Sequence, residues 1–269
     1  IMNKKRSTLN LLILAACSLC CVSSQAAEVE VKYKPNPPPM AITLPKMRRG
    51  YVDGPFGQKL HAKLAEKNII GLAYTELGFR NITNSKRPIA KVEDLAGLKL
   101  RVIPNPINVD WVSALGANPT QMSWADAQPA MASSAVDGQE NPLSVYMAAK
   151  LYTVAQKHLT LWGYMNDPLI FVVNKDIWNS WTPADREIVK QAAIDAGKEQ
   201  VVIARKGVIE ADKPLLKEIA SHGVTVTQLS PGEREAFVKA TRPVVEKWKG
   251  QIGADLVNMA EKAIAARKK

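Results

Sequence analysis

The chain has 269 residues, of which 46% are apolar and 23% are charged. These fractions are typical of globular proteins and exclude a disordered or fibrous chain. The formal net charge of +11 brings nucleic acid into question, but segments such as DREIVKQAAIDAGKEQ mix both signs as solvated helix faces do. We therefore expect no nucleic-acid partner and a positive field that favours small anionic ligands.

Residues 1–26 have the features of a secretory signal. The basic letters KKR precede an apolar run from Leu9 to Val22, and the small-residue site SQA ends at Ala26. The run is too short and too close to the start for a typical spanning helix. We expect cleavage after Ala26 and export to the periplasm.

All three cysteines lie in this same segment, at positions 17, 20 and 21. The letters LAAC, ending at Cys17, resemble the box at which bacterial lipoproteins are cut and lipidated, which is the alternative to cleavage after Ala26. Cleavage after Ala26 would leave neither disulfides nor a thiol nucleophile. His61, His158 and His222 stand singly without ligand spacing, so we predict no metal site and no cofactor.

The mature chain is predicted to begin with an extended segment and then a helix. Residues 34–50 contain five prolines, which is typical of a linker. Asp53 can cap a helix that has Pro55 in its first turn. The helix has one apolar stripe, made of Phe56, Leu60 and Leu64. After it, GLAYTEL predicts a strand, RNITNSKRP a polar loop and LAGLKLRV a second strand.

Helix and strand patterns alternate through the rest of the chain. Helices are predicted near 109–115, over 124–134 and through VYMAAKLYTVAQKH, and strands in LTLWG and PLIFVVN. Thr182 and Ser230 are each predicted to cap the start of a helix whose first residue is a proline. The pattern after Thr182 runs to Gly223 with a break or kink at Pro214, and VTVTQL and two helices follow. This alternation predicts an α/β sheet with helices on its faces.

Arg101 is the first candidate for ligand binding. Alternation in LAGLKLRVIP places Leu98, Leu100 and Val102 on one face of the strand and Arg101 on the other. Arg101 lies at the carboxyl end of the strand, where open α/β sheets bind ligands, and its planar guanidinium matches a carboxylate. The alternative is that Arg101 is an exposed charge or pairs with a nearby acid. The pattern does not distinguish this alternative from a role in ligand binding.

The segment AVDGQENP is the second candidate. Asn141 can donate an amide, and Gly138 lets the backbone approach closely. Turn chemistry is the alternative, and the pattern by itself favours it. Trp124 either forms the wall of a pocket or fills the core.

The sequence shows no catalytic constellation. It has no Gly-rich phosphate loop, Ser-His-Asp order, HExxH motif or nucleophile elbow. An enzyme acting on a carboxylate would need a base near Arg101, for which Asp137, Glu140 and Asp167 are the candidates. We therefore predict a binding protein rather than an enzyme.

Four successive blocks resemble the solute-binding proteins of tripartite ATP-independent periplasmic (TRAP) transporters, of the C4-dicarboxylate-binding type. They are DLAGLKLRVIPNP, ALGANPTQMSWADA, AVDGQENPLSVYMAAKLYTVAQKHLTL and PADREIVKQAA. The resemblance implies a two-lobed, periplasmic-binding-protein-like α/β fold with a long inter-lobe helix. It further implies a monomer that closes on an organic acid and delivers it to the TRAP permease membrane subunits.

The resemblance also implies a set of ligand-binding residues. By motif position, Arg101 is the carboxylate-binding arginine and Asn141 the cleft amide. Trp124 takes the aromatic position, and Arg80 in GFRNITNSKRPI matches a second arginine. Dicarboxylates, sugar acids, keto acids and aromatic acids could all bind to one arginine, so the sequence does not identify which organic acid is bound.

The chain departs from the family in its first lobe, where roughly eighty residues of strands and helices are replaced by 34–50. We expect 1–26 to be the signal and 27–50 a stub with the linker. The expected lobe I remnant is 51–77 with 191–230, and lobe II is 78–190 with 231–269. A truncated, non-transporting remnant or a sensory binding module is therefore the alternative function.

Overall fold

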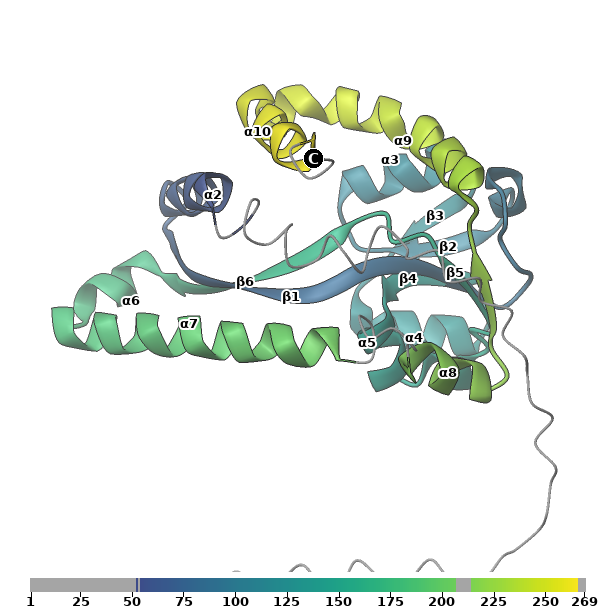
Figure 1. The fold of residues 1–269 in the computed structure, drawn as a ribbon, viewed down its shortest axis with the longest axis horizontal. Helices are drawn as coiled ribbons and strands as arrows, with labels where there is room; N and C mark the ends of the chain where they lie inside the picture. The colour runs from purple at the N-terminus through teal and green to yellow at the C-terminus, as the bar shows by residue number, and fades with distance from the viewer. Residues whose placement is uncertain (1–51, 53, 207–213, 266–269) are drawn as a thin grey trace, which may run out of the picture. The chain divides into compact units, whose positions relative to one another are not determined.

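The computed structural model describes residues 52, 54–206 and 214–265. The predicted signal, the lipoprotein box and the 27–50 segment lie outside these ranges. Within them, strand β1 (Ile69–Asn84) is long enough to pair with three other strands (Figure 1). Its first part pairs antiparallel with β6 (Asn166–Asn174), with register shifts between Gly71 and Ala73 and between Glu76 and Gly78. Its last part pairs antiparallel with β4 (Gly138–Pro142) and β5 (His158–Leu161).

The other strands extend this sheet on both sides. The order along the main path is β3-β2-β4-β1-β5-β7, with β3 (Asn118–Gln121), β2 (Lys99–Val102) and β7 (Thr225–Gln228). β2 is parallel to β3 and β4, and β7 is parallel to β5. The predicted α/β class is therefore confirmed, with a mixed sheet.

Helices cover both faces of this sheet (Figure 1). A first cluster of buried apolar side chains joins β2 to α3 (Pro106–Ala114) and α9 (Pro231–Ile252). A second cluster lies under α4 (Trp124–Ala132), α5 (Leu143–Ala148) and α8 (Pro214–Ser221). Leu98, Leu100 and Val102 all belong to the first cluster, which confirms the predicted alternation.

Helices α7 (Pro183–Arg205) and α9 begin where the sequence predicted, whereas the N-cap of α2 (Pro55–Ala65) is Gly54 and the predicted cap Asp53 lies outside the described residues. Thr182 accepts a hydrogen bond from the backbone of Asp185 at the start of α7, and Ser230 forms a full capping box on α9. α2 buries Phe56, and α6 (Lys175–Ser180) and α10 (Ala254–Ala265) complete the set. Two short 3₁₀ turns, η1 (Val92–Leu95) and η2 (Leu151–Val154), connect elements. None of the described helices combines the length and apolarity needed to cross a membrane.

Three local predictions were wrong. The helix predicted through VYMAAKLYTVAQKH is interrupted, because α5 ends at Ala148, Leu151–Val154 is the 3₁₀ turn η2 and β5 begins at His158. The RNITNSKRP segment is not a loop at its start, because Arg80–Asn84 is the end of β1 and is buried. The turn alternative for AVDGQENP is also wrong, because Gly138–Pro142 is the fully buried strand β4. Both segments are polar because their side chains bond to one another inside the fold, and this hides the usual apolar signal of a buried strand.

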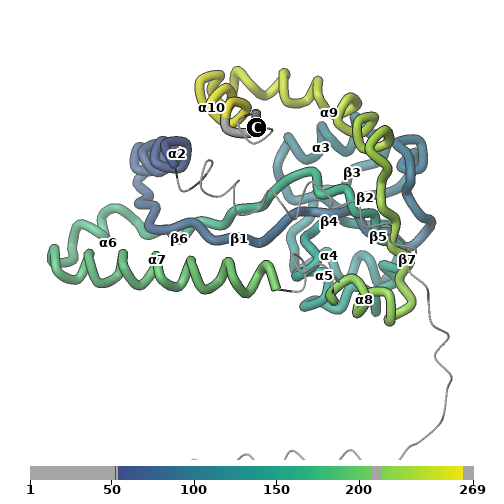
Figure 2. Tube along the Cα trace, in the orientation of Figure 1, coloured from purple at the N-terminus to yellow at the C-terminus, as the bar shows by residue number. Residues whose placement is uncertain are grey.

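One part of the predicted lobe division differs from the structure. The segment 191–230 was assigned to the first lobe, yet β7 pairs in parallel with β5 of the main sheet, and Figure 2 shows the two side by side. Ile219 of α8 is packed in the second apolar cluster. The residues 214–228 therefore belong with the sheet that holds β2 and β4. The other lobe boundaries stay predictions.

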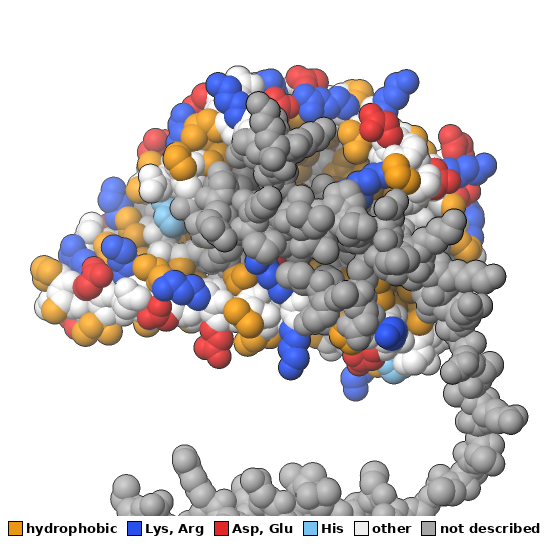
Figure 3. Space-filling view, viewed as in Figure 1, with side chains coloured by type: hydrophobic (Ala, Val, Ile, Leu, Met, Phe, Trp, Pro, Cys, Tyr) orange, Lys and Arg blue, Asp and Glu red, His pale blue; other side chains and the backbone are white. Residues whose placement is uncertain are grey.

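Surface charges over α9 and α10 are interspersed rather than gathered by sign (Figure 3). Arg242 pairs with Glu246 one turn on and with Glu261 of α10, and Lys249 also pairs with Glu261. This is the mixed pattern that the sequence of the C-terminal half indicated.

Candidate functional site

The candidate site is built around β4, whose successive side chains point to opposite faces of the sheet. Glu140 lies opposite Ile82 of β1, which is part of the first apolar cluster. Residues directly opposite in an antiparallel pair share a face, so Glu140 lies on the side of α3 and α9. Gln139 and Asn141 then face the side of α4 and α5.

On the first face, Arg80 of β1 is held by two carboxylates. Its Nε and Nη2 donate to the two carboxylate oxygens of Glu140, and Nη2 also donates to the Glu140 carbonyl oxygen at 2.8 Å. Its Nη1 donates to Asp167 of β6. Arg80 and Glu140 are only 2% and 1% exposed, so water does not screen this pair.

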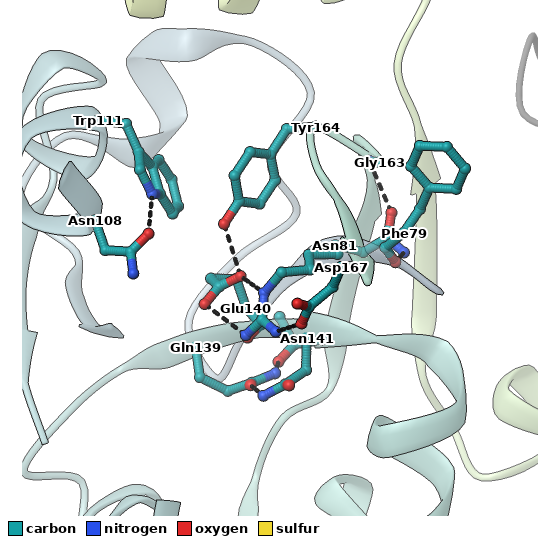
Figure 4. Close-up of polar contacts among 12 residues, drawn as sticks. Phe79, Asn81, Asn108, Trp111, Gln139, Glu140, Asn141, Gly163, Tyr164 and Asp167 are labelled. Carbon is teal, nitrogen blue, oxygen red and sulfur yellow. Dashed lines mark hydrogen bonds and ion pairs between the residues drawn. The ribbon is translucent and has the colours of Figure 1, made fainter. Parts of the chain in front are cut away.

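Tyr164 completes this cluster from the connection between β5 and β6. Its hydroxyl donates to Glu140 Oε2 at 2.8 Å, and Figure 4 shows the ring directed at that carboxylate. Burial and the charge of Glu140 raise the pKa of the Tyr164 hydroxyl, which keeps it protonated as a donor. Burial opposes the charge of Arg80, but its bond to Glu140 and the nearby acids raise its pKa above the ordinary value.

On the second face, Arg101 lies next to Trp124. Its guanidinium carbon is 5.5 Å from the centre of the Trp124 ring, and its Nε donates to the Met122 carbonyl oxygen at 3.1 Å. Arg101 alternates with the buried Leu100 and Val102, which places it on the face of α4, where Trp124 is the first helical residue. The two residues thus meet because α4 begins close to where β2 ends.

Arg101 differs from Arg80 in its charge environment. It is 3% exposed, and no carboxylate within the described ranges pairs with it. Burial lowers the pKa of Arg101, while the charge of Glu140 raises it and the charge of Arg80 lowers it further. A buried guanidinium without an acid is costly unless an anion is supplied, so this position is suited to binding a carboxylate.

Asn141 lies on the same face as Arg101, inside a chain of polar side chains. Its amide nitrogen donates to Gln139 Oε1, and Gln139 in turn donates to Thr83 at 2.8 Å. Figure 4 shows Gln139 and Asn141 stacked below Glu140. Gly138 precedes them, and an added Cβ would lie 2.2 Å from the Thr83 carbonyl oxygen. The predicted close backbone approach at Gly138 is therefore present, against β1.

The structure thus brings Arg101 and Trp124 into contact and places Asn141 on the neighbouring strand β4, on the same face as Arg101. Arg80 lies one strand further, on β1, and on the opposite face of the sheet. The sequence analysis missed Tyr164, for which no motif gave a signal. It considered Asp137, Glu140 and Asp167 only as bases of an enzyme. Asp137 instead accepts the backbone N–H of Lys99 at 2.9 Å and pairs with Lys86. Within the described residues, no group of three or more His, Cys, Asp or Glu is placed to hold a metal ion.

The chain is similar in sequence and in fold to several known proteins. A solved TRAP periplasmic solute-binding protein from Ralstonia eutropha, with bound (S)-2-acetolactate, is 60% identical with a TM-score of 0.80. The match covers 82% of this chain and 70% of that one. A solute-binding protein of Verminephrobacter eiseniae is 37% identical over 205 residues, and the match covers 76% of this chain and 59% of that protein.

Another relative is the C4-dicarboxylate-binding periplasmic protein of Rhodobacter capsulatus, which is 32% identical over 215 residues. That match covers 79% of this chain and 62% of the relative. This chain therefore spans about three fifths of the length of these two sequence relatives. The model of bacterial extracellular solute-binding proteins, family 7, matches residues 41–251. The chain belongs to this family of solute-binding proteins.

Proposed function

We propose that this chain is the solute-binding component of a TRAP transporter and that it binds an organic acid through Arg101. The observation that carries the proposal is the buried guanidinium of Arg101, which lies against Trp124 and has no acid partner among the described residues. The ligand carboxylate would form a bidentate, charge-assisted pair there. Trp124 and Asn141 would line the same site.

The ligands of related proteins support an organic acid. The Ralstonia eutropha protein holds (S)-2-acetolactate, and a sugar acid binding protein of Advenella mimigardefordensis, 36% identical, holds galactonate. A periplasmic protein of Escherichia coli, 34% identical, binds 2,3-diketo-L-gulonate. These ligands differ in length and in their hydroxyl and keto groups, but each carries a carboxylate.

Delivery to TRAP permease membrane subunits and a periplasmic location are part of the same proposal. The family is one of extracellular transport proteins, and its TRAP members are periplasmic. Export would depend on the signal proposed for 1–26, and we propose that the chain acts as a monomer without a cofactor. An enzymatic role is not supported by the acids of the site, because Glu140 and Asp167 are both bound to Arg80.

Titration calorimetry of the mature chain with a panel of organic acids and their methyl esters tests the proposal. The esters keep the carbon skeleton and remove the negative charge, so they control for binding by shape. We expect at least one acid to bind and its ester to bind at least about a hundredfold more weakly, because the pair with Arg101 is lost. Equal binding of acid and ester, or no binding of any acid, would refute the proposal.

A further inference from the structure

A line of buried polar side chains runs inward from Asn141, on the face of the sheet that also carries Arg101. Gln139 and Thr83 lie opposite each other on β4 and β1, and Gln156 precedes β5. These three residues are each at most 1% exposed, whereas Asn141 is 6% exposed and is the outer end of the line. Polar groups buried to this extent need hydrogen-bond partners within the protein. We call these four residues the polar relay.

The direction of each hydrogen bond in the polar relay is set at its inner end. Gln156 Nε2 donates to the backbone carbonyl oxygen of Asp137 at 3.3 Å, and a carbonyl oxygen can only accept. The amide oxygen of Gln156 therefore faces Thr83 and accepts the single hydroxyl proton of Thr83 at 3.0 Å. Thr83 then has only lone pairs left, so it accepts from Gln139 Nε2 at 2.8 Å. The amide oxygen of Gln139 is thereby turned toward Asn141.

The same order fixes the orientation of the Asn141 amide. Gln139 Oε1 accepts a hydrogen bond from Asn141 Nδ2 (Figure 4). Asn141 Oδ1 makes no hydrogen bond with any of the residues that the structure describes. An amide without this constraint could offer either end to a ligand. Here the groups that remain for a ligand are the oxygen of Asn141, which accepts, and the second N–H of the same amide.

Asn141 lies at the same edge of the sheet as Arg101. Leu100 of β2 is opposite Gly138 of β4 in a parallel pair, so Arg101 lies beside Gln139. Asn141 is two residues further on, about 7 Å along β4 toward its carboxyl end. A small acid that is bound by Arg101 at this edge therefore has the Asn141 amide as a neighbour.

Resting on the proposed function, we propose that Gln156, Thr83 and Gln139 are positioning residues that hold the oxygen of Asn141 toward the ligand, and that the ligand is a hydroxy acid. A hydroxyl group beside the carboxylate can donate to Asn141 Oδ1 and accept from the second N–H. A keto oxygen can only accept, so it leaves Oδ1 without a partner. The site therefore favours a hydroxy acid over the keto acid of the same carbon skeleton.

The first test compares matched hydroxy and keto acids by titration calorimetry on the mature chain. The pairs are lactate and pyruvate, 2-hydroxybutanoate and 2-oxobutanoate, and 2-hydroxyglutarate and 2-oxoglutarate. In each pair that binds, we expect the better enantiomer of the hydroxy acid to bind at least about fivefold more tightly, because it makes one more hydrogen bond. Equal or tighter binding of the keto acids would overturn this inference and leave the proposed function intact. Binding of other acids without binding of any member of these pairs would overturn it too. Absence of binding for every organic acid would instead refute the proposed function.

The second test interrupts the polar relay at Thr83. Thr83→Val keeps the shape of the side chain but removes the hydroxyl, so the amides of Gln139 and Asn141 are no longer held in one orientation. We expect the preference for the hydroxy acid to fall below about twofold. Thr83→Ser keeps the hydroxyl and should retain the preference. Thr153→Val is the matched control, because the exposed Thr153 hydroxyl bonds to the Lys150 carbonyl oxygen outside the relay.

The ratio of the two affinities separates positioning from packing, because a general loss of packing lowers the affinity for both acids alike. A Thr83→Val protein that is folded by circular dichroism and keeps the full preference would contradict the role of the relay. Loss of the preference in Thr83→Ser to the same extent as in Thr83→Val would contradict it as well. Should Thr83→Val fail to fold, Thr83→Ser and the ligand pairs on the unaltered chain still decide the inference.

Discussion

The guanidinium of Arg101 lies over the ring of Trp124, 5.5 Å from its centre, so an aromatic side chain provides one wall for a cation that pairs with no acid among the described residues. Trp124 is 37% exposed and is held at the first position of α4, directly after the N-cap Ser123. Its ring therefore contributes little to the core and is available to orient Arg101. The ring face attracts the cation and restricts its motion.

The first prediction is that Trp124→Ala weakens binding of an organic acid by about three- to tenfold, which matches a cation–π contribution of about 0.7–1.4 kcal/mol. Trp124→Phe should retain part of the affinity because a smaller aromatic face remains. Calorimetric titration measures the change. The control is Trp178→Phe, whose ring contacts Trp181 rather than the site. Equal affinities for Trp124→Ala and the unaltered chain would show that the ring does not orient Arg101.

The second prediction concerns Arg101 itself. Loss of one partner of a buried ion pair costs about 3–5 kcal/mol, so Arg101→Ala should lower the affinity for the acid by at least about a hundredfold. Arg101→Lys should restore little, because an ammonium group cannot form two parallel hydrogen bonds with a carboxylate.

Lys99 supplies the matched control on the same strand. It is exposed and lies two residues earlier, about 7 Å from Arg101 along β2. Lys99→Ala removes the same charge from the same face and should change the affinity by less than about tenfold. A comparable loss in both variants would mean that overall charge, and not the fork of Arg101, binds the acid.

The sequence predicted those features that depend on neighbouring residues. The caps at Thr182 and Ser230 join groups three positions apart, and the alternation that buries Leu100 and turns Arg101 to the other face is a property of one strand. The pair Arg80–Glu140 joins residues 60 positions apart, so no local pattern encodes it. Arg80 and Glu140 are polar because they pair with each other. Their polarity is why the two strands that hold them were predicted to be a loop and a turn.

The family motif and the structure account for different properties of the two arginines. Arg80 was selected only because a motif matched, and the structure shows why it is an arginine: two acids from two strands require a forked donor. Arg101 was selected by strand alternation and by the motif, and the structure adds the ring of Trp124. A ligand role for either arginine is a proposal, and the variants of Arg101 test it for that residue.

The third prediction concerns the stability that Arg80 and Glu140 share. Glu140→Gln and Arg80→Met should each lower the free energy of unfolding by about 3–5 kcal/mol, because each leaves a buried charged partner without its counter-charge. The double variant Arg80→Met/Glu140→Gln should lose less than the sum of the two single changes, since neither member of the pair is left as a buried charge without its partner. Urea denaturation of the chain and its variants measures the differences.

An exposed pair provides the comparison for this prediction. Lys198 and Asp195 on α7 are 68% and 59% exposed and 3.2 Å apart. Lys198→Ala should change the free energy of unfolding by less than about 1 kcal/mol. If Glu140→Gln costs no more than Lys198→Ala, the buried pair does not hold β1 and β4 together.

The last prediction is a loss of stability in mild acid that depends on His61. Its ring stacks on Tyr74 at 4.6 Å, and its buried Nε2 has no hydrogen-bond partner among the described residues. Burial lowers the pKa of His61 below its ordinary value of 6.5, so the unfolded chain binds a proton more readily than the folded one. The stability that this neutral histidine contributes is therefore present above pH 6.5 and is lost as the pH falls below it.

The test is to measure the urea midpoint of unfolding between pH 7.5 and 5 for the chain and for His61→Phe, which keeps a ring against Tyr74 but cannot take up a proton. We expect the midpoint of the unaltered chain to fall through this range and that of His61→Phe to fall less. His222→Phe is the matched control, because His222 also stacks on a tyrosine, Tyr152, at 3.9 Å. Identical pH profiles for His61→Phe and the unaltered chain would show that other groups cause the loss.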